Sequence, residues 1–162
     1  MISIIMGSDS DFSIMEETAK MLKSFGIKYE MKILSAHRTP EAVRNYVKNA
    51  EKKGIKLFVA GAGGAAHLPG VIASFTTLPV IGVPLGSELK GMDSLFSIVQ
   101  MPKGVPVATM AIGKAGAINA AILAAEILAL SDKKIKNSLM DLRKKISKDV
   151  LTKSASITRR KC

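Results

Sequence analysis

The sequence predicts an α/β fold in which helices cover a parallel sheet of five strands. Short apolar runs alternate with segments of helical periodicity, which is the order expected when helices connect parallel strands. The 162 residues have the length of one domain. Apolar residues make up 48% of the chain and charged residues 23%, a balance typical of folded proteins and not of disordered ones.

Five apolar runs are the expected strands. The second run is less apolar than the others, so we expect it at an edge of the sheet. From first to fifth, the runs are residues 2–6, 28–34, 57–60, 80–83 and 107–112.

The first two helices have recognisable ends. Apolar residues recur at helical spacing from Phe12 to Leu22, and Gly26 suits the position just past this helix. Thr39 can cap the second helix, which we expect to end at Gly54.

Two later segments indicate contacts beyond a simple globular unit. Residues 84–106 form a long connection with a short helix near residues 93–99, and connections of this length are usually functional lids or contacts between subunits. Residues 115–130 form a helix that is apolar on nearly every face. We expect this helix to be buried all round and to contribute to an oligomer interface as well as to the core.

Positive charge is concentrated at the C-terminal end. Residues 1–130 hold 13 Lys and Arg against 10 Asp and Glu, a net charge of +3, whereas residues 131–162 hold 11 against 3, a net charge of +8. We divide the chain into a single α/β domain, residues 1–150, ending in a basic helix over residues 133–150, and a basic tail, residues 151–162. The sequence does not decide whether this tail is ordered. A nucleic-acid arm is one interpretation, but the absence of an aromatic residue that could stack on bases favours a solvated terminal helix.

Cofactor and targeting signals are absent from the sequence. The only cysteine is Cys162, so an internal disulfide and a Cys-based zinc site are excluded, and two histidines provide no further metal-ligand set. Lys114 follows a glycine but lacks the rest of a Walker phosphate-binding pattern. No basic leader precedes Asp9, and no apolar stretch reaches the roughly 18 residues of a membrane span. We therefore expect a soluble cytoplasmic protein that binds no metal.

The turn after the first strand, residues 7–11 (GSDSD), has the features of an anion site. Gly7 allows a ligand to approach the backbone, the serine hydroxyls can donate hydrogen bonds, and the N-terminus of the following helix attracts negative charge. An ordinary helix cap is the alternative interpretation.

The turn after the second strand, residues 35–40 (SAHRTP), places His37 beside Arg38. Imidazole titrates near neutral pH and can move protons, while guanidinium can hold a phosphate at two places. A lone histidine is more often structural, so the neighbouring arginine and the position in the turn are what favour a functional role.

The turn after the third strand, residues 61–67 (GAGGAAH), has almost no side chains before His67. Such a turn exposes main-chain N–H groups and leaves room for a flat ligand. Tight packing of the next helix is the alternative, although six consecutive small residues exceed what packing requires. His67 could contact a ligand or cap its helix.

These three turns should converge, because ligands of open parallel sheets bind outside the carboxyl ends of the strands. Together they offer phosphate donors, a carboxylate, a proton carrier and an unobstructed wall. The sequence therefore predicts a site for a small phosphorylated anion that contains a ring.

At the level of whole motifs the chain resembles the PurE family. The resemblance covers about residues 2–150 and rests on several long motifs in the same order. They are residues 7–11, 35–40, 61–70, 82–84, 93–102 and 111–117. The chain is most similar to the class I form, the N5-carboxyaminoimidazole ribonucleotide mutases of purine biosynthesis. The class II form, a carboxylase that uses CO2 directly, typically has Lys where Arg38 stands and a different third turn.

The resemblance implies a fold, an assembly and a reaction. The fold is a flavodoxin-like three-layer α/β/α sandwich with an extended C-terminal helix, and the assembly is a homo-octamer in which that helix packs on neighbouring subunits. The reaction moves a carboxyl group from a nitrogen to carbon C4 of an aminoimidazole ribonucleotide through CO2. No metal or organic cofactor is implied, and residues 1–150 become the catalytic domain.

The resemblance also implies roles for residues of the three turns. His37 would be the catalytic acid and base. Ser8, Ser10 and Arg38 would hold the phosphate, and Asp11 the ribose hydroxyls, while the base and carboxyl group would lie against Ser35 and the third turn. The full expected substrate-binding set is Ser8, Ser10, Asp11, Ser35, Ala36, Arg38, Gly61, Gly63, Gly64, His67 and Leu68.

Three other functions remain open at this point. The first is the class II carboxylase. The second is a non-enzymatic receiver-type signalling domain, for which Asp9, Asp11 and Lys114 would suit the acidic pocket and lysine, although the third strand ends without the aspartate that accepts the phosphoryl group. The third is a flavin carrier.

Overall fold

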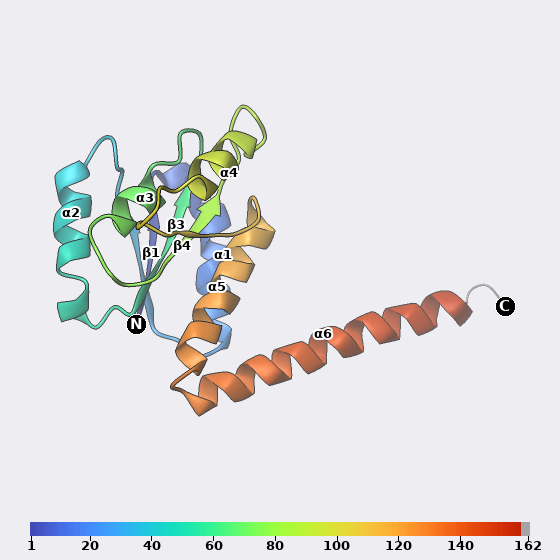
Figure 1. The fold of residues 1–162 in the computed structure, drawn as a ribbon. Helices are drawn as coiled ribbons and strands as arrows, with labels where there is room; N and C mark the ends of the chain where they lie inside the picture. The colour runs from blue at the N-terminus through green and yellow to red at the C-terminus, as the bar shows by residue number, and fades with distance from the viewer. Residues whose placement is uncertain (160–162) are drawn as a thin grey trace.

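The computed structural model describes residues 1–159 as a three-layer α/β/α sandwich with one long helix extending from it (Figure 1). All five strands of the sheet are parallel, in the order β2-β1-β3-β4-β5, so β2 lies at an edge as expected. The strands are β1 (Ile2–Met6), β2 (Tyr29–Ile33), β3 (Leu57–Ala62), β4 (Val80–Pro84) and β5 (Ala108–Thr109). The fold predicted from the sequence is thereby confirmed.

Only β1 has the expected bounds; β2 and β4 differ from the expectation by one residue at one or both ends, and β3 and β5 differ more. β3 continues through Gly61 and Ala62, which the sequence analysis placed in the following turn. β5 is only two residues long, not six, and pairs on one side only, with Ile81 and Gly82 of β4.

Helices cover both faces of the sheet. The six helices of the described residues are α1 (Phe12–Ser24), α2 (Pro40–Lys48), α3 (Leu68–Ala73), α4 (Met92–Val99), α5 (Lys114–Ala129) and α6 (Lys133–Arg159). Single 3-10 turns occur at Asp9–Asp11 and Glu51–Lys53. α1 and α5 pack together on one face, while buried side chains of α2, α3 and α4 join the core of the other face.

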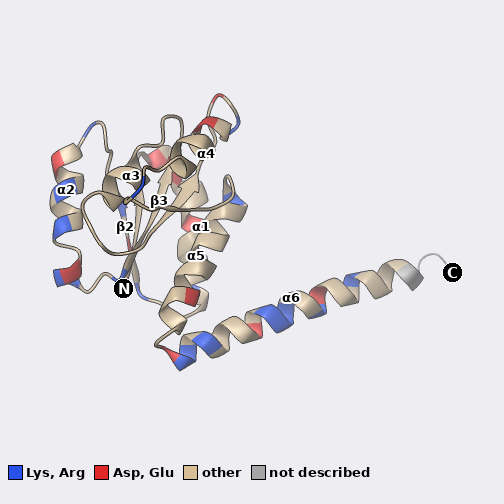
Figure 2. Ribbon diagram, in the orientation of Figure 1, with Lys and Arg blue, Asp and Glu red and all other residues tan. Residues whose placement is uncertain are grey.

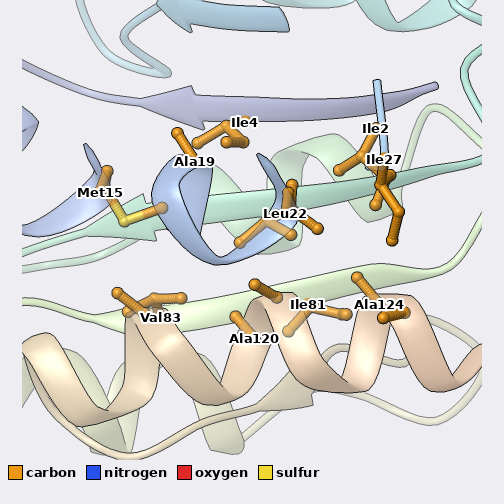
Figure 3. Packing of buried hydrophobic residues seen from close by; sticks show 14 of the residues in the cluster. Ile2, Ile4, Met15, Ala19, Leu22, Ile27, Ile81, Val83, Ala120 and Ala124 are labelled. Carbon is orange, nitrogen blue, oxygen red and sulfur yellow. The ribbon is translucent and has the colours of Figure 1, made fainter. Parts of the chain in front are cut away.

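The core between α1, α5 and the sheet is aliphatic and closely packed (Figure 3). α1 contributes Met15, Ala19 and Leu22, and α5 contributes Ala120 and Ala124, all of them nearly or fully buried. The alanines allow the two helices to approach closely. α5 is thus buried through a small-residue face, and its larger aliphatic side chains are only partly buried in the single chain, contrary to the expectation of burial all round.

α2 begins after Thr39 as predicted, but it does not end at Gly54. Thr39 occupies the N-cap of α2 but makes no capping hydrogen bond, because its hydroxyl closes the preceding turn by donating to the carbonyl oxygen of Ser35 at 3.1 Å. α2 ends at Lys48, and Gly54 instead ends the following 3-10 turn in the left-handed conformation. The expectation for Gly26 is confirmed, since it lies just past α1 with φ of 68°.

α6 continues to Arg159, nine residues beyond the expected end at Val150, so the described part of the basic tail is helical. Residues 160–162 lie outside the described part of the chain. Leu139 is buried against the core, and Lys and Arg residues recur along α6 from Lys133 to Lys153 (Figure 2). An ion pair of 3.1 Å between Arg143 and Glu126 also connects α6 to α5. Within the described residues no helix combines the length and apolarity needed to cross a bilayer.

A glycine at the start of α5 sets how closely this helix approaches the preceding segment. A Cβ atom on Gly116 would lie 1.6 Å from the carbonyl oxygen of Ala111, a backbone atom that cannot rotate away. We therefore expect Gly116→Ala to lower the free energy of unfolding by about 3 kcal/mol, the upper part of the range for overpacking. Urea denaturation measures this change. Gly86→Ala is the control, because its methyl group would meet no atom within 4 Å; equal stability of the two variants would contradict the prediction.

Candidate active site

A cavity of about 390 Å³ lies at the carboxyl ends of the strands. The segments that follow β1, β2, β3 and β4 all contribute to its wall. The predicted site residues that line it are Ser8, Ser10, Asp11, Ser35, Ala36, His37, Arg38, Gly63, Gly64, His67 and Leu68. The three turns therefore converge as the position of the strand ends predicts.

Gly61 is the one predicted site residue that does not line this cavity. It lies within β3 and is buried, and a Cβ atom there would come within 2.4 Å of the sulfur of Met15 on α1. The absence of a side chain at Gly61 serves the packing of α1 on the sheet. The alternative interpretation of the glycine-rich turn, close packing, thus holds for its first residue.

The contribution of the loop after β4 to the cavity was not predicted from the sequence. Gly86, Ser87 and Glu88 line the cavity together with the turns after the first three strands. The available signal was the length of the connection over residues 84–106, which the sequence analysis interpreted as a lid or a subunit contact without assigning residues to the site. Gly7, Ala62 and Ala66 also line the cavity.

The first turn is organised by reciprocal hydrogen bonds around Ser8. The backbone N–H of Ser10 donates to the Ser8 hydroxyl oxygen at 3.4 Å, and the backbone N–H of Ser8 donates to the Asp11 carboxylate at 3.1 Å, which together form a capping box. The Ser8 hydroxyl donates to Asp9 at 2.9 Å, and this hydrogen bond holds the pKa of Asp9 below its usual value. Asp9 is therefore an anion at neutral pH.

Asp11 is the half-buried carboxylate of the cavity. Burial raises the pKa of Asp11 above its usual value, against the opposing effect of the N–H groups of Ser8 and Gly7. A carboxylate can only accept hydrogen bonds when it is ionised, so the hydroxyls of a sugar are suitable partners for Asp11.

The second turn aims Arg38 across the site. Its guanidinium donates to the carbonyl oxygen of Gly7 at 2.8 Å and, through Nε, to the Ser35 hydroxyl at 3.4 Å. The Ser35 hydroxyl also accepts from the backbone N–H of Arg38 at 3.2 Å. Arg38 thereby joins the first and second turns and brings a positive charge next to the serines of the first turn, an arrangement that suits a phosphate.

The third turn brings the two histidines of the chain together. Nε2 of His37 and Nδ1 of His67 lie 2.6 Å apart, and the two rings meet edge to face. One nitrogen of this hydrogen bond must carry the proton and the other must accept it, so the pair binds at most three protons. His67 occupies the N-cap of α3 without a capping hydrogen bond, and it lines the cavity.

The backbone before His67 is also unusual. Gly64 has φ of 59° and Ala66 has φ of 48°, a left-handed conformation that residues other than glycine adopt rarely. Strained backbone of this kind is frequent at functional sites.

Comparisons with known proteins show the family of the chain. The family model described as AIR carboxylase matches residues 1–149. The chain belongs to the AIR carboxylase family. Among its curated relatives, a protein of Vibrio parahaemolyticus is 56% identical over 151 residues, covering 93% of this chain and 94% of the relative. One of Thermotoga maritima is 55% identical over 154 residues, covering 94% of this chain and 89% of the relative. Both relatives are named N5-carboxyaminoimidazole ribonucleotide mutase.

A solved structure of a PurE protein is also similar to this chain. The crystal structure of Treponema denticola PurE superimposes with a TM-score of 0.87 at 33% sequence identity, covering 96% of both chains. The similarity extends over the whole sandwich and supports the flavodoxin-like fold.

The geometry disfavours the receiver-domain alternative. A receiver domain would need its lysine near the acidic pocket, but Lys114 does not line the cavity and pairs with Glu17 at 3.3 Å. β3 ends in Gly61 and Ala62, neither of which can accept a phosphoryl group.

The hydrogen bond between the histidines predicts a measurable role for His67. In the variant His67→Leu, His37 loses the group that orients its ring, so we expect kcat to fall about 10- to 100-fold, with KM changed much less. His67→Asn keeps a polar atom near the position of Nδ1 and should retain more activity than the leucine variant. Steady-state kinetics of the two variants measures this difference, and unchanged kcat in His67→Leu would contradict the prediction.

Proposed function

We propose that the chain converts N5-carboxyaminoimidazole ribonucleotide to 4-carboxy-5-aminoimidazole ribonucleotide in purine biosynthesis, in the cytoplasm. The observation that carries the proposal is the hydrogen-bonded pair of His37 and His67 in one cavity with Arg38 and the glycine turn. Relatives at 55–56% identity named as this mutase support the same assignment.

The cavity has a suitable group for each part of this substrate. We assign the phosphate to Arg38 and the hydroxyls of Ser8 and Ser10, and the ribose hydroxyls to Asp11. The ring and its carboxyl group lie against Ser35 and the main chain of residues 63–67, where no long side chain would interfere. The net charge of +11 attracts the anionic substrate over a longer range.

His37 performs two proton transfers in the proposed mechanism. Its imidazolium first donates a proton to the carbamate nitrogen, and the N–C bond breaks so that its electrons remain on nitrogen and CO2 is released. The ring is then an enamine-like nucleophile whose carbon C4 attacks CO2. The neutral imidazole finally removes the C4 proton, which restores the aromatic ring and the imidazolium. His67 can orient His37 throughout, because its hydrogen bond engages Nε2 of His37.

This sequence of steps requires that CO2 stays beside C4. Holding two reactants in place removes much of the entropic barrier of a bimolecular step, provided that the pocket is closed. In the single chain both His37 and His67 are exposed. Enclosure must therefore come from the substrate, from the loops around the cavity and from a neighbouring subunit.

A turnover assay tests the function directly. The purified protein should convert N5-carboxyaminoimidazole ribonucleotide in buffer freed of bicarbonate, and the product is measured by chromatography. A direct carboxylase, the class II alternative, should be inert toward this compound and should instead carboxylate aminoimidazole ribonucleotide when bicarbonate is supplied. The second outcome would replace the proposed reaction. A flavin carrier would be coloured when purified, which an absorption spectrum detects.

His37→Asn tests the acid–base role. The amide cannot exchange a proton near neutral pH, so we expect kcat to fall by about 10²- to 10⁴-fold while substrate affinity stays close to that of the wild type. Calorimetric titration and kinetics measure the two quantities separately. Full activity of this variant would remove His37 from the mechanism.

Arg38→Ala tests the phosphate site. Loss of charge-assisted hydrogen bonds to phosphate should weaken substrate binding by about 10- to 100-fold. Arg44→Ala is the matched control, because Arg44 forms only an exposed pair with Glu41 at 3.9 Å and does not line the cavity. An unchanged affinity of Arg38→Ala would place the phosphate elsewhere.

We also propose that the chain forms an octamer through α6 and other exposed apolar side chains. Leu139 packs on the core, and the same stripe of the helix continues as Ile146, Val150 and Ile157, which are 48%, 61% and 61% exposed. An exposed apolar stripe that extends beyond its own domain can be buried by packing against a second copy of the chain. α4 exposes a further stripe, Met92, Phe96 and Val99.

Sedimentation velocity measures the assembly. The wild type should sediment as an octamer, and the double variant Ile146→Glu, Val150→Glu should dissociate to smaller species. Lys145→Glu with Lys148→Glu changes charges on the opposite side of the helix and should leave the octamer intact. A monomeric wild type would refute the proposed assembly.

A further inference from the structure

The loop that follows β4, residues 85–91, forms part of the cavity wall but has no role in the mechanism described above. Gly86, Ser87 and Glu88 line the cavity. The loop also lies close to the third turn, since a Cβ atom on Gly63 would be 3.0 Å from the carbonyl oxygen of Gly86. This loop therefore closes the side of the cavity next to the glycine turn, where the ring and the carboxyl group are assigned.

α4 fixes the conformation of this loop through two side chains. The Ser87 hydroxyl donates to the carboxylate of Asp93, and the backbone N–H of Gly91 donates to the Ser87 oxygen at 3.2 Å. The fully buried hydroxyl of Ser94 lies 2.7 Å from the carbonyl oxygen of Leu85 and 2.9 Å from that of Gly91. Ser94 thus bridges the two ends of the loop, and Asp93 holds its middle.

The loop needs this support because its backbone is strained. Lys90 has φ of 55° and Gly91 has φ of 87°, so two consecutive residues are left-handed and one of them is not glycine. Surrounding interactions must maintain such a conformation. The hydroxyl of Ser87 also holds the pKa of Asp93 below its usual value, so at neutral pH Ser87 donates to an anion, which makes a strong hydrogen bond.

We propose that Asp93 is a positioning residue which, by holding Ser87, keeps residues 86–88 against the third turn and retains CO2 beside the substrate ring. The proposal rests on the proposed function, in which CO2 is released and recaptured. Because the imidazoles of His37 and His67 are exposed in the single chain, the loops around the cavity must contribute to its closure. Asp93 acts only through Ser87 and touches neither substrate nor CO2.

The consequence of a displaced loop can be written as a balanced step. His37 still protonates the carbamate nitrogen, and the N–C bond still breaks to give CO2. If CO2 then leaves the cavity, the ring stays uncarboxylated and dissociates as aminoimidazole ribonucleotide, and His37 regains its proton from water. The loss of closure is therefore measured as the share of turnovers that end in aminoimidazole ribonucleotide.

The test compares Ser87→Ala, Asp93→Ala and the double variant in bicarbonate-free buffer. Both nucleotide products are quantified at a single turnover of N5-carboxyaminoimidazole ribonucleotide. We expect each single variant to raise the uncarboxylated share several-fold over the wild type. The double variant should do no more than Ser87→Ala, since Asp93 acts on the loop only through the hydroxyl of Ser87.

Two further variants serve as controls. Ser87→Thr keeps the hydroxyl and should restore the wild-type partition. Ser74→Ala also removes a serine hydroxyl, one that donates to the carbonyl oxygen of Val71 at 2.7 Å beside a different cavity, and should leave the partition unchanged. Thermal unfolding of each variant checks its fold. If Asp93→Ala does not fold, Ser87→Ala carries the test, because it leaves every residue of α4 unchanged.

The possible outcomes separate this proposal from the proposed function. If the wild type forms the carboxylated product and both single variants keep its partition, the positioning role is refuted. Additive effects in the double variant would also refute it, because Asp93 would then act independently of Ser87. If the wild type does not convert the substrate, the proposed function fails first, and the role of Asp93 fails with it.

Discussion

The register of three parallel strands is the constraint on which the site depends. Met6, the last residue of β1, pairs with Ile33 at the end of β2 and with Gly61 near the end of β3. The three strands therefore end at nearly the same level of the sheet, and the turns that follow them start side by side. This register brings His37 and His67, which are 30 residues apart in sequence, to within one hydrogen bond of each other. A shift of one residue in any pair would separate them and reverse the side chains of that strand.

The sandwich supplies rigidity, and the turns supply chemistry. β1, β3 and β4 are buried along their whole length, while the groups that could contact a substrate are on four loops at one edge of the sheet. Within these loops, most hydrogen bonds connect one turn to itself or to its neighbour, as Ser8 does with Asp11 and Arg38 with Gly7. A cavity built in this way is ordered by its own polar network but stays open to solvent in the single chain. In the proposed mechanism the cavity is closed by the loop after β4, by the bound substrate and by a neighbouring subunit.

Local patterns predicted the elements well and several individual roles poorly. The order of strands and helices follows from apolar periodicity, and the convergence of the turns follows from parallel topology. The role of Gly61 could not be predicted, because only the packed structure shows that Met15 occupies the space where a side chain would be. Threonine is a residue type that often caps helices, yet the carbonyl oxygen of Ser35 provides a competing partner for the hydroxyl of Thr39. α6 continues past Val150 because no proline or glycine interrupts residues 151–159.

The sequence by itself determined the fold class, the family and the three turns that carry polar chemistry, since these depend on local composition and on motifs that are contiguous in the chain. Only the tertiary structure decided which groups meet. It brought His37 into contact with His67 and Asp93 into contact with Ser87. It also left an apolar stripe of α6 exposed beyond the core of the domain. Such contacts and exposures arise when distant segments pack together, and no short stretch of sequence contains them.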